Sequence, residues 1–278
     1  MGVLYVVATP IGNLDDITLR AIRVLRDVSL IAAEDTRKTG KLLAHHDIDT
    51  PLLSCFEHNE LARTAQFLSR LARHDVALVS DAGTPGISDP GYRLITAAID
   101  AGIEVVPVPG PSAVTAALAV SGLPTDSALY LGFLPRKAGQ RRRALKKVAD
   151  EPYTLIILEA PHRLLRSLAD VLETLGNRRM AIARELTKLH EETLRGTVSE
   201  LLAHFTEHPP RGEFTLVIEG AGEDRGRWPS SRVREAMAEL LEEGLRRKEA
   251  ARLLASESGW STREVYELRD ENHDIQPE

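Results

Sequence analysis

Cysteine and aromatic residues are scarce in this sequence of 278 residues. The single cysteine, Cys55, excludes an internal disulfide framework and any zinc site built from several cysteines. Because aromatic residues make up only 4%, we expect a core of Leu, Ile, Val and Ala. The N-terminal apolar run is too short to span a membrane and lacks the basic segment of a secretory signal. These absences predict a soluble, cytoplasmic protein with no membrane contact.

Several ligand-binding motifs are absent as well. Neither G-x-G-x-x-G nor G-x-x-x-x-G-K-[ST] occurs, so dinucleotide and P-loop triphosphate sites lack their fingerprints. His162, His190 and the pair Glu191–Glu192 match no metal-ligand spacing, and we expect no metal. The net charge of −6 argues against indiscriminate binding to nucleic acid.

Short apolar runs alternate with amphipathic stretches over about the first 220 residues, the pattern of an α/β protein. The expected strands are 3–8, 30–33, 76–80, 103–106, 153–158, 180–183 and 214–218. The expected helices are 19–28, 59–73, 93–101, 113–121, 162–175 and 198–204. A Gly-Pro break at 121–127 and a polar, glycine-rich linker at 220–231 are candidate boundaries. A capping box that begins at Thr197 is expected to start the helix at 198–204. Beyond the linker only helices are expected, with Gly244 and Gly259 as stops and a second capping box that begins at Ser261.

Four of the expected strands end in loops rich in Gly, Pro, Asp and Thr. These loops are "ATPIGNLDD", "AEDTRKTG", "SDAGTPGISDPG" and "PVPGPSA". In open α/β sheets, ligands bind where loops leave the carboxyl ends of the strands. Glycine lets the backbone approach a ligand closely, and proline holds a loop in shape. The four loops together therefore predict a ligand cleft at this edge of the sheet.

Six blocks, in order, resemble the tetrapyrrole-methylase superfamily of S-adenosylmethionine-dependent enzymes: "VVATPIGNLDDITLRA", "AEDTRKTGKLL", "ALVSDAGTPGISDPGYRL", "VVPVPGPSAVTAALAVSGLP", "LGFLPRK" and "ARELTKLHEE". They are most similar to the branch that methylates the ribose 2′-oxygen of a cytidine in the decoding centre of 16S ribosomal RNA. The resemblance implies two α/β domains with the active-site cleft between them, a homodimer, and the small ribosomal subunit as partner. With the helical appendage, the expected domains are 1–122, 123–225 and an all-α domain at 228–278.

The resemblance also implies the residues that hold S-adenosylmethionine. In the first domain these are Pro10, Ile11, Gly12, Asp81, Gly83, Thr84, Pro85, Ser112 and Ala113. In the second domain they are Leu158, Glu159 and Thr215. The tetrapyrrole enzymes carry a longer G-x-G-P-G-D stretch in the first loop, where this sequence has "TPIGN". That difference favours the RNA branch over the alternative of a tetrapyrrole or other small-molecule methylase.

Methyl transfer requires little covalent work from a protein, because the methyl group is already activated and alignment contributes most. A ribose hydroxyl is a weak nucleophile, so a nearby base or cation would help to remove its proton. Candidates are Glu34, Asp35, Arg37 and Lys38, and the charged residues Arg184, Glu185 and Lys188. We expect Lys188 or Glu185 to be the base. The alternative is that these charges pair with one another as a structural network.

A cluster of seven cations without any acidic residue lies in "RKAGQRRRALKK". Cations that neutralise phosphates release counterions and so drive binding to RNA. We therefore expect an RNA surface formed by this cluster with Arg37 and Lys38; its members are Arg136, Lys137, Arg141, Arg142, Arg143, Lys146 and Lys147. The alternative is a solvated helix face. The segment from residue 228 onward has a helix-turn-helix character, but its net charge of −4 disfavours a DNA-binding regulator.

Overall fold

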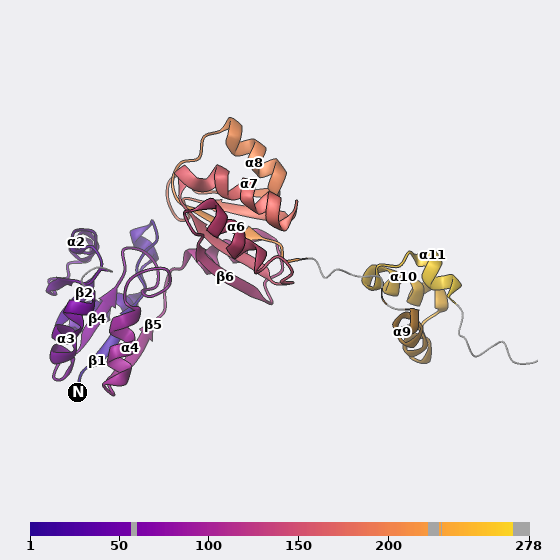
Figure 1. Ribbon diagram of the computed structural model, residues 1–278. Helices are drawn as coiled ribbons and strands as arrows, with labels where there is room; N and C mark the ends of the chain where they lie inside the picture. The colour runs from indigo at the N-terminus through magenta and orange to yellow at the C-terminus, as the bar shows by residue number, and fades with distance from the viewer. Residues whose placement is uncertain (57–59, 222–227, 229, 269–278) are drawn as a thin grey trace, which may run out of the picture. The chain divides into compact units, whose positions relative to one another are not determined.

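The structure, a computed structural model, describes residues 1–56, 60–221, 228 and 230–268 (Figure 1). It divides into two compact units, Met1–Gly220 and Ala221–Glu278. Asn59, where a helix was expected to begin, lies outside the described residues, as do most of the linker and residues 269–278.

A parallel five-stranded sheet forms the N-terminal half of the first unit. Its order is β3-β2-β4-β1-β5. The strands are β1 (Val3–Val7), β2 (Leu30–Ala33), β3 (Leu52–Ser54), β4 (Val76–Val79) and β5 (Glu104–Val108). Successive residues of β4 alternate between two cores, because neighbouring side chains of a strand point to opposite faces. Helices α1 (Leu19–Asp27) and α2 (Thr36–His45) pack on one face, and α3 (Glu60–Leu71) and α4 (Tyr92–Asp100) on the other. A sheet covered on both faces requires the continuous apolar runs from which these strands were predicted.

A mixed sheet forms the second half, in the order β6-β7-β10-β8-β9. Its strands are β6 (Ala128–Phe133), β7 (Thr154–Glu159), β8 (Arg179–Arg184), β9 (Glu192–Thr197) and β10 (Phe214–Ile218). Only β6 and β7 pair in parallel. Helices α6 (Ala138–Lys146), α7 (Leu164–Leu175) and α8 (Val198–Glu207) share the core of one face (Figure 1). On the other face α5 (Ala113–Ser121), which follows the last strand of the first sheet, packs against β8 and β10 through small residues.

The seven strands predicted from the sequence are confirmed within two residues at each end, and the strands that were not predicted lie at sheet edges. β3 has three residues, β6 contains a register shift beside Gly132, and β9 is half-buried and carries charged residues. Edge strands lack a second neighbour and a fully apolar environment, so their composition gives a weak signal. Two short 3-10 helices, η1 (Leu14–Asp16) and η2 (Pro161–Arg163), follow β1 and β7.

The second unit contains α9 (Ser230–Glu242), α10 (Arg247–Ser258) and α11 (Thr262–Glu267) around a small core that includes Val233, Met237 and Leu254. Gly259, with φ at 68°, ends α10, and the predicted capping box of Ser261 begins α11. The capping box of Thr197 at α8 is also confirmed. Among the described residues, no helix has both the length and the apolar character needed to cross a membrane.

Candidate functional site

The loops that follow β1 and β4 are joined by their backbones. Thr9 and Gly83 exchange two backbone hydrogen bonds, of 2.9 and 3.0 Å, and the Thr9 hydroxyl donates to the carbonyl of Ser80 at 3.1 Å. Because both strands are parallel neighbours, their carboxyl ends meet at one edge of the sheet. The loops after β1 and β4 are therefore fixed to each other at this edge of the sheet.

All three glycines of the β4–α4 loop, among them Gly86 with φ at 80°, occupy conformations that other residues tolerate poorly. Gly83 has φ at 78°, and Gly91, at the start of α4, has φ at 123°. A Cβ atom at Gly91 would lie 2.8 Å from Leu78 Cδ2, inside the core. The special backbone after β4 thus has a structural reason, since the chain must turn back tightly onto the sheet it has just left.

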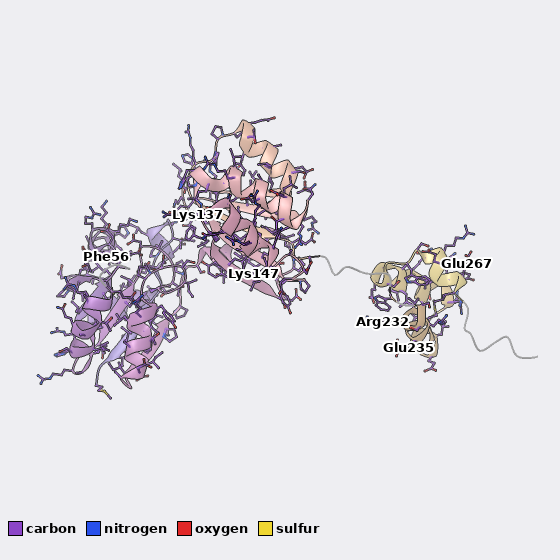
Figure 2. All side chains as sticks on the ribbon, in the orientation of Figure 1. Phe56, Lys137, Lys147, Arg232, Glu235 and Glu267 are labelled. Carbon is purple, nitrogen blue, oxygen red and sulfur yellow. The ribbon has the colours of Figure 1, made fainter. Side chains whose placement is uncertain are left out.

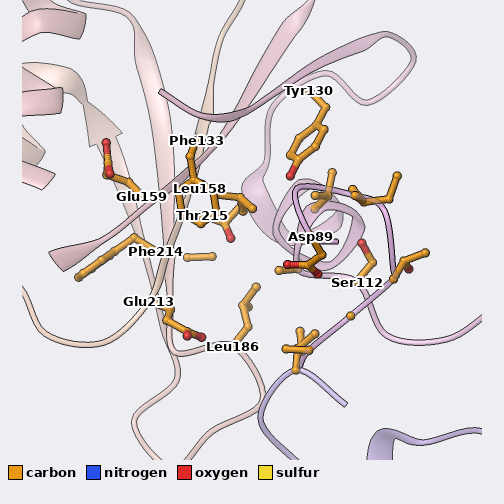
Figure 3. A pocket seen from close by; sticks show the side chains of 18 of the residues that line it. Asp89, Ser112, Tyr130, Phe133, Leu158, Glu159, Leu186, Glu213, Phe214 and Thr215 are labelled. Atoms are coloured by element: carbon orange, nitrogen blue, oxygen red, sulfur yellow. The ribbon is translucent and has the colours of Figure 1, made fainter. Parts of the chain in front are cut away.

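A cavity of about 410 Å³ lies between the loops of the first sheet and the second sheet. This volume is within the range of small-molecule sites. Figure 3 shows Asp89 and Ser112 on one side, with Leu158 and Thr215 across from them and Tyr130 above. Eight of the residues expected to hold the cofactor line this cavity: Ile11, Gly83, Thr84, Ser112, Ala113, Leu158, Glu159 and Thr215.

The remaining expected cofactor residues, Pro10, Gly12, Asp81 and Pro85, are not part of the lining. Gly12 packs against the loop after β8, where a Cβ atom would lie 2.4 Å from Lys188 Cγ. Asp81 is held by the loop and helix that follow β2. Its carboxylate accepts from the backbone N–H of Asp35 at 3.0 Å and from Lys38 Nζ at 2.7 Å. The Asp81 side chain therefore connects two loops instead of facing the cavity.

Three acidic residues of the loops after β2 and β4 lie close together: Glu34, Asp81 and Asp89. The carboxylate of Glu34 accepts from the backbone N–H of Asp81 at 3.1 Å, and burial raises the pKa of Glu34. Burial, together with the charges of Glu34 and Asp81, raises the pKa of Asp89 to about 6. Lys38 supplies the nearby positive charge, and its hydrogen bond to Asp81 raises its own pKa. This side of the cavity therefore favours a cationic ligand.

Glu159 lines the cavity, while its carboxylate is bound by residues of η2 and α7. That carboxylate accepts a hydrogen bond from the Ser167 hydroxyl and lies 3.2 Å from Arg163 Nε. The side chain is fully buried, so it is not available to a ligand. Thr215 and Leu158 are partners in adjacent strands β10 and β7, which sets them side by side on the wall.

The charged loop after β8 forms a network at the rim, the structural alternative considered for these residues. Lys188 Nζ lies 2.9 Å from the carboxylates of both Glu185 and Glu213. Although burial opposes the effect, these bonds raise the pKa of Lys188, and Lys188 in turn lowers that of Glu185. A protonated, doubly paired amine is a poor proton acceptor, so Lys188 is better suited to act as a cation than as the expected base.

The basic cluster lies on and beside α6, whose ends are labelled in Figure 2 at Lys137 and Lys147. Arg141 differs from the other members: it is buried and forms an ion pair with the buried Asp170 of α7. Arg142 is half-exposed, 3.1 Å from Glu173 and 3.6 Å from Asp170. Arg141 therefore holds α6 against α7 and is not available to RNA, which corrects the expectation from the sequence.

Of the second-loop cations, Arg37 is 87% exposed and pairs with Asp35 at 2.8 Å. This contact holds the pKa of the Asp35 carboxyl well below its usual range. Lys38 is exposed as well but bound to Asp81. Neither lines the cavity.

Asp89, Tyr130 and Phe133 are among the lining residues that sequence reasoning missed. Asp89 lies in the same loop as Asp81 and repeats its Ser-Asp pair, which was the available signal. The Tyr130 hydroxyl is hydrogen-bonded to Ser88 at 2.7 Å, and Phe133 is 53% exposed. In a chain so poor in aromatic residues, two of them on the strand before the basic cluster were a further signal.

Residues 3–202 match the family described as Tetrapyrrole (Corrin/Porphyrin) Methylases. The chain is 51% identical over 271 residues to Ribosomal RNA small subunit methyltransferase I of Synechocystis, which covers 96% of this chain and 97% of that one. The protein of the same name from Thermotoga maritima is 52% identical over 221 residues, covering 79% of this chain and 99% of that one. Uroporphyrin-III C-methyltransferase from Thermus thermophilus, solved with S-adenosylhomocysteine, shares the fold at 18% identity and a TM-score of 0.56, covering 78% and 97% of the two chains.

These matches define a methyltransferase built on two α/β sheets, the class expected from the sequence. The chain belongs to the tetrapyrrole (corrin/porphyrin) methylase family.

Proposed function

We propose that this protein transfers a methyl group from S-adenosylmethionine to the ribose 2′-oxygen of a cytidine in the decoding centre of 16S ribosomal RNA. The observation that carries the proposal is the similarity, over 96% of the chain, to a relative named for small-subunit ribosomal RNA. The cavity and the basic surface of α6 support it from the chemistry of the residues. We further infer that the protein works in the cytoplasm as a homodimer, on the small subunit.

The lining of the cavity fits the donor. Ile11, Leu158 and Ala183 offer apolar surface to an adenine ring, and the backbone at Gly83 and Thr84 offers polar groups at close range. Ser112 is the N-cap residue of α5 without capping it through its side chain, so its hydroxyl is available to a ligand. The first N–H groups of a helix have no partners within the helix and suit a carboxylate. The acidic cluster behind Asp89 suits the donor's cationic sulfur and amine.

In this proposal the remaining expected residues shape the site. Asp81 fixes the second loop against the third, and Pro10, Gly12 and Pro85 hold loop geometry. When bound, the donor supplies an activated methyl group. The residues of the protein hold the acceptor oxygen in line with that group and exclude water, the arrangement that contributes most to such a transfer. Lys188, paired with Glu185 and Glu213, holds the loop after β8 at the rim of the cavity.

The exposed cations of α6 supply the grip on RNA. The helix begins a few residues after Phe133 of the cavity wall, so a chain bound along it would lead toward the cavity. A methylase of tetrapyrroles or other small molecules is the alternative, and the relative from Thermus is named for such an activity. A small acid would not require several cations along a helix outside the cavity, which favours RNA.

Ribosomal RNA from cells that lack this protein provides the test. Mass mapping should show the loss of one ribose methyl group from a cytidine of the 16S RNA, and the purified protein with labelled donor should restore it on small subunits. If no ribose methyl group disappears, or if label enters only a small molecule, the proposal is wrong. Comparing free 16S RNA with assembled subunits in the same assay identifies the true substrate.

A further inference from the structure

Three acidic residues line the cavity, and the surroundings of their carboxylates differ: Asp89, Glu159 and Glu213. The carboxylate of Glu159 is buried against Ser167, and the side chain of Glu213 is 79% exposed and paired with Lys188. Within the described part of the chain, no cation forms an ion pair with Asp89. Asp89 is thus the carboxylate that can act on a ligand inside the cavity.

Asp89 shares the lining of the cavity with two groups of residues. The first group consists of Gly83, Thr84 and Ser112, the residues proposed to hold the donor. The second group is aromatic: Tyr130 lies above Asp89, and Phe133, whose ring is exposed, lies across the cavity beside Leu158 (Figure 3). Both suit a nucleoside because bases stack on aromatic side chains. Figure 3 shows the Asp89 carboxylate beside Ser112 and below Tyr130, so it faces the space where a donor on the first group and a nucleoside on the second would meet.

We propose that the Asp89 carboxylate accepts the proton of the acceptor 2′-hydroxyl during methyl transfer. This inference rests on the function proposed above. The new bond joins the hydroxyl oxygen to the methyl carbon, and the carbon–sulfur bond breaks with its electron pair left on sulfur. The hydroxyl proton moves to Asp89 and from there to water, so charge and atoms balance without any other reactant.

The surroundings of Asp89 suit this task. The negative charges of Glu34, after β2, and of Asp81, in the same loop as Asp89, raise the pKa of Asp89. The positive charge of Lys38 on α2 lowers it, and Tyr130 on β6 is a further titratable group nearby. With its pKa near 6, the carboxyl group holds a proton more readily than an ordinary aspartate and is still ionised at neutral pH. A cationic donor beside it would shift this value down, so the acid limb of activity is expected at or below pH 6.

The test compares Asp89→Asn with the wild type in single-turnover methylation of small subunits from cells that lack the protein, with saturating donor. We expect the rate to fall by about 100- to 10,000-fold, the usual contribution of a general base. Donor affinity, measured by calorimetry, should stay within about threefold. Below the pKa that limits activity on the acid side, the wild-type rate should fall about tenfold per pH unit, and the residual rate of the variant should not show this fall.

Two further variants and a measurement without substrate complete the design. Asp100→Asn, at the exposed end of α4, makes the same change in charge and should leave the rate and the pH profile unchanged. Asp89→Glu keeps a carboxylate and should recover part of the rate. In the protein alone, the native state disfavours the ionised form of Asp89, so stability is lost as the pH rises from about 4 to 6. Asp89→Asn should therefore raise the melting temperature at pH 8 relative to the wild type, and less so at pH 4.

The outcomes separate the two proposals. If the wild type adds no ribose methyl group, the proposed function is wrong and the role of Asp89 falls with it. If the wild type is active and Asp89→Asn keeps its rate and its acid limb, only the role of Asp89 is wrong. If the variant loses donor affinity in proportion to its rate, Asp89 holds the donor and does not accept the proton. If Asp89→Asn does not fold, an Asp89→Glu variant with an unchanged rate and an unshifted acid limb would overturn the assignment.

Discussion

The sharpest test of the RNA surface is to remove two cations from the exposed face of α6. Lys146 and Lys147 are exposed, at the end of the helix, and within the described residues neither forms an ion pair. Replacing both with glutamine keeps the length and the helix propensity of the side chains while removing two charges. If each lysine neutralises one phosphate, both contacts are lost.

The expected loss follows from counterion release. For single-stranded nucleic acid the logarithm of the binding constant changes by about 0.7 per contact for each tenfold change in salt. The salt slope of the double variant should therefore be smaller by about 1.4. At 0.15 M salt the same relation gives about 0.8 kcal/mol per contact, or about a 15-fold weaker affinity for the two together.

The assay is a titration of labelled small subunits with the protein at several salt concentrations. Arg20→Gln with Arg23→Gln is the matched control, because it removes two exposed charges from α1, a helix on the first sheet. The control should keep the wild-type slope, and both variants should bind the donor normally. An unchanged slope for the α6 variant would refute the reasoning, as would an equal loss in the control, which would indicate only an effect of net charge.

Three further predictions concern stability and the loop frame. Arg141→Met leaves Asp170 buried without its main partner and should lower the free energy of unfolding in urea by about 3–5 kcal/mol. Arg141→Met with Asp170→Leu should recover most of that loss. A double variant less stable than the single variant would contradict a buried ion pair. Asp81→Ala releases Lys38 and should weaken donor binding in calorimetry, because the third loop loses its tie to the second; unchanged affinity would show that the tie does not matter. Burial raises the pKa of the Cys55 thiol to about 12, so thiol reagents should label it only after unfolding, and rapid labelling of the native protein would be contrary to this packing.

The central strands could be predicted from the sequence because their burial is complete. β4 is apolar at every position, because helices cover both faces of the first sheet. A short, continuous apolar run is typical of a strand buried on both faces, so this strand could be predicted. The edge of the sheet at which the loops rich in Gly, Pro, Asp and Thr meet could also be predicted from the sequence, because parallel strands joined by helices all end on the same side. The two capping boxes could be identified because a cap is formed by neighbours in the chain.

Charged side chains were the difficult part, since a charge pattern does not say which partner will be near. Arg141 read as one of seven similar cations, yet the helical position that points it at α7 makes it part of the interior. Asp81 read as a ligand of the donor, yet Lys38, 43 residues earlier in the chain, holds its carboxylate. Such pairs form between segments distant in sequence, and only the folded chain brings them together.

By itself, the sequence determined the α/β class, the family and the edge of the sheet where the loops gather, because these depend on local pattern and on the order of the elements. The tertiary structure decided which charges are free. It paired Lys188 with two glutamates, buried Arg141 and left Asp89 facing the cavity without an ion-pair partner in the described part of the chain. The physical reason is that the state of an ionisable group depends on its desolvation and on the charges within a few ångströms, and both are properties of the packed chain.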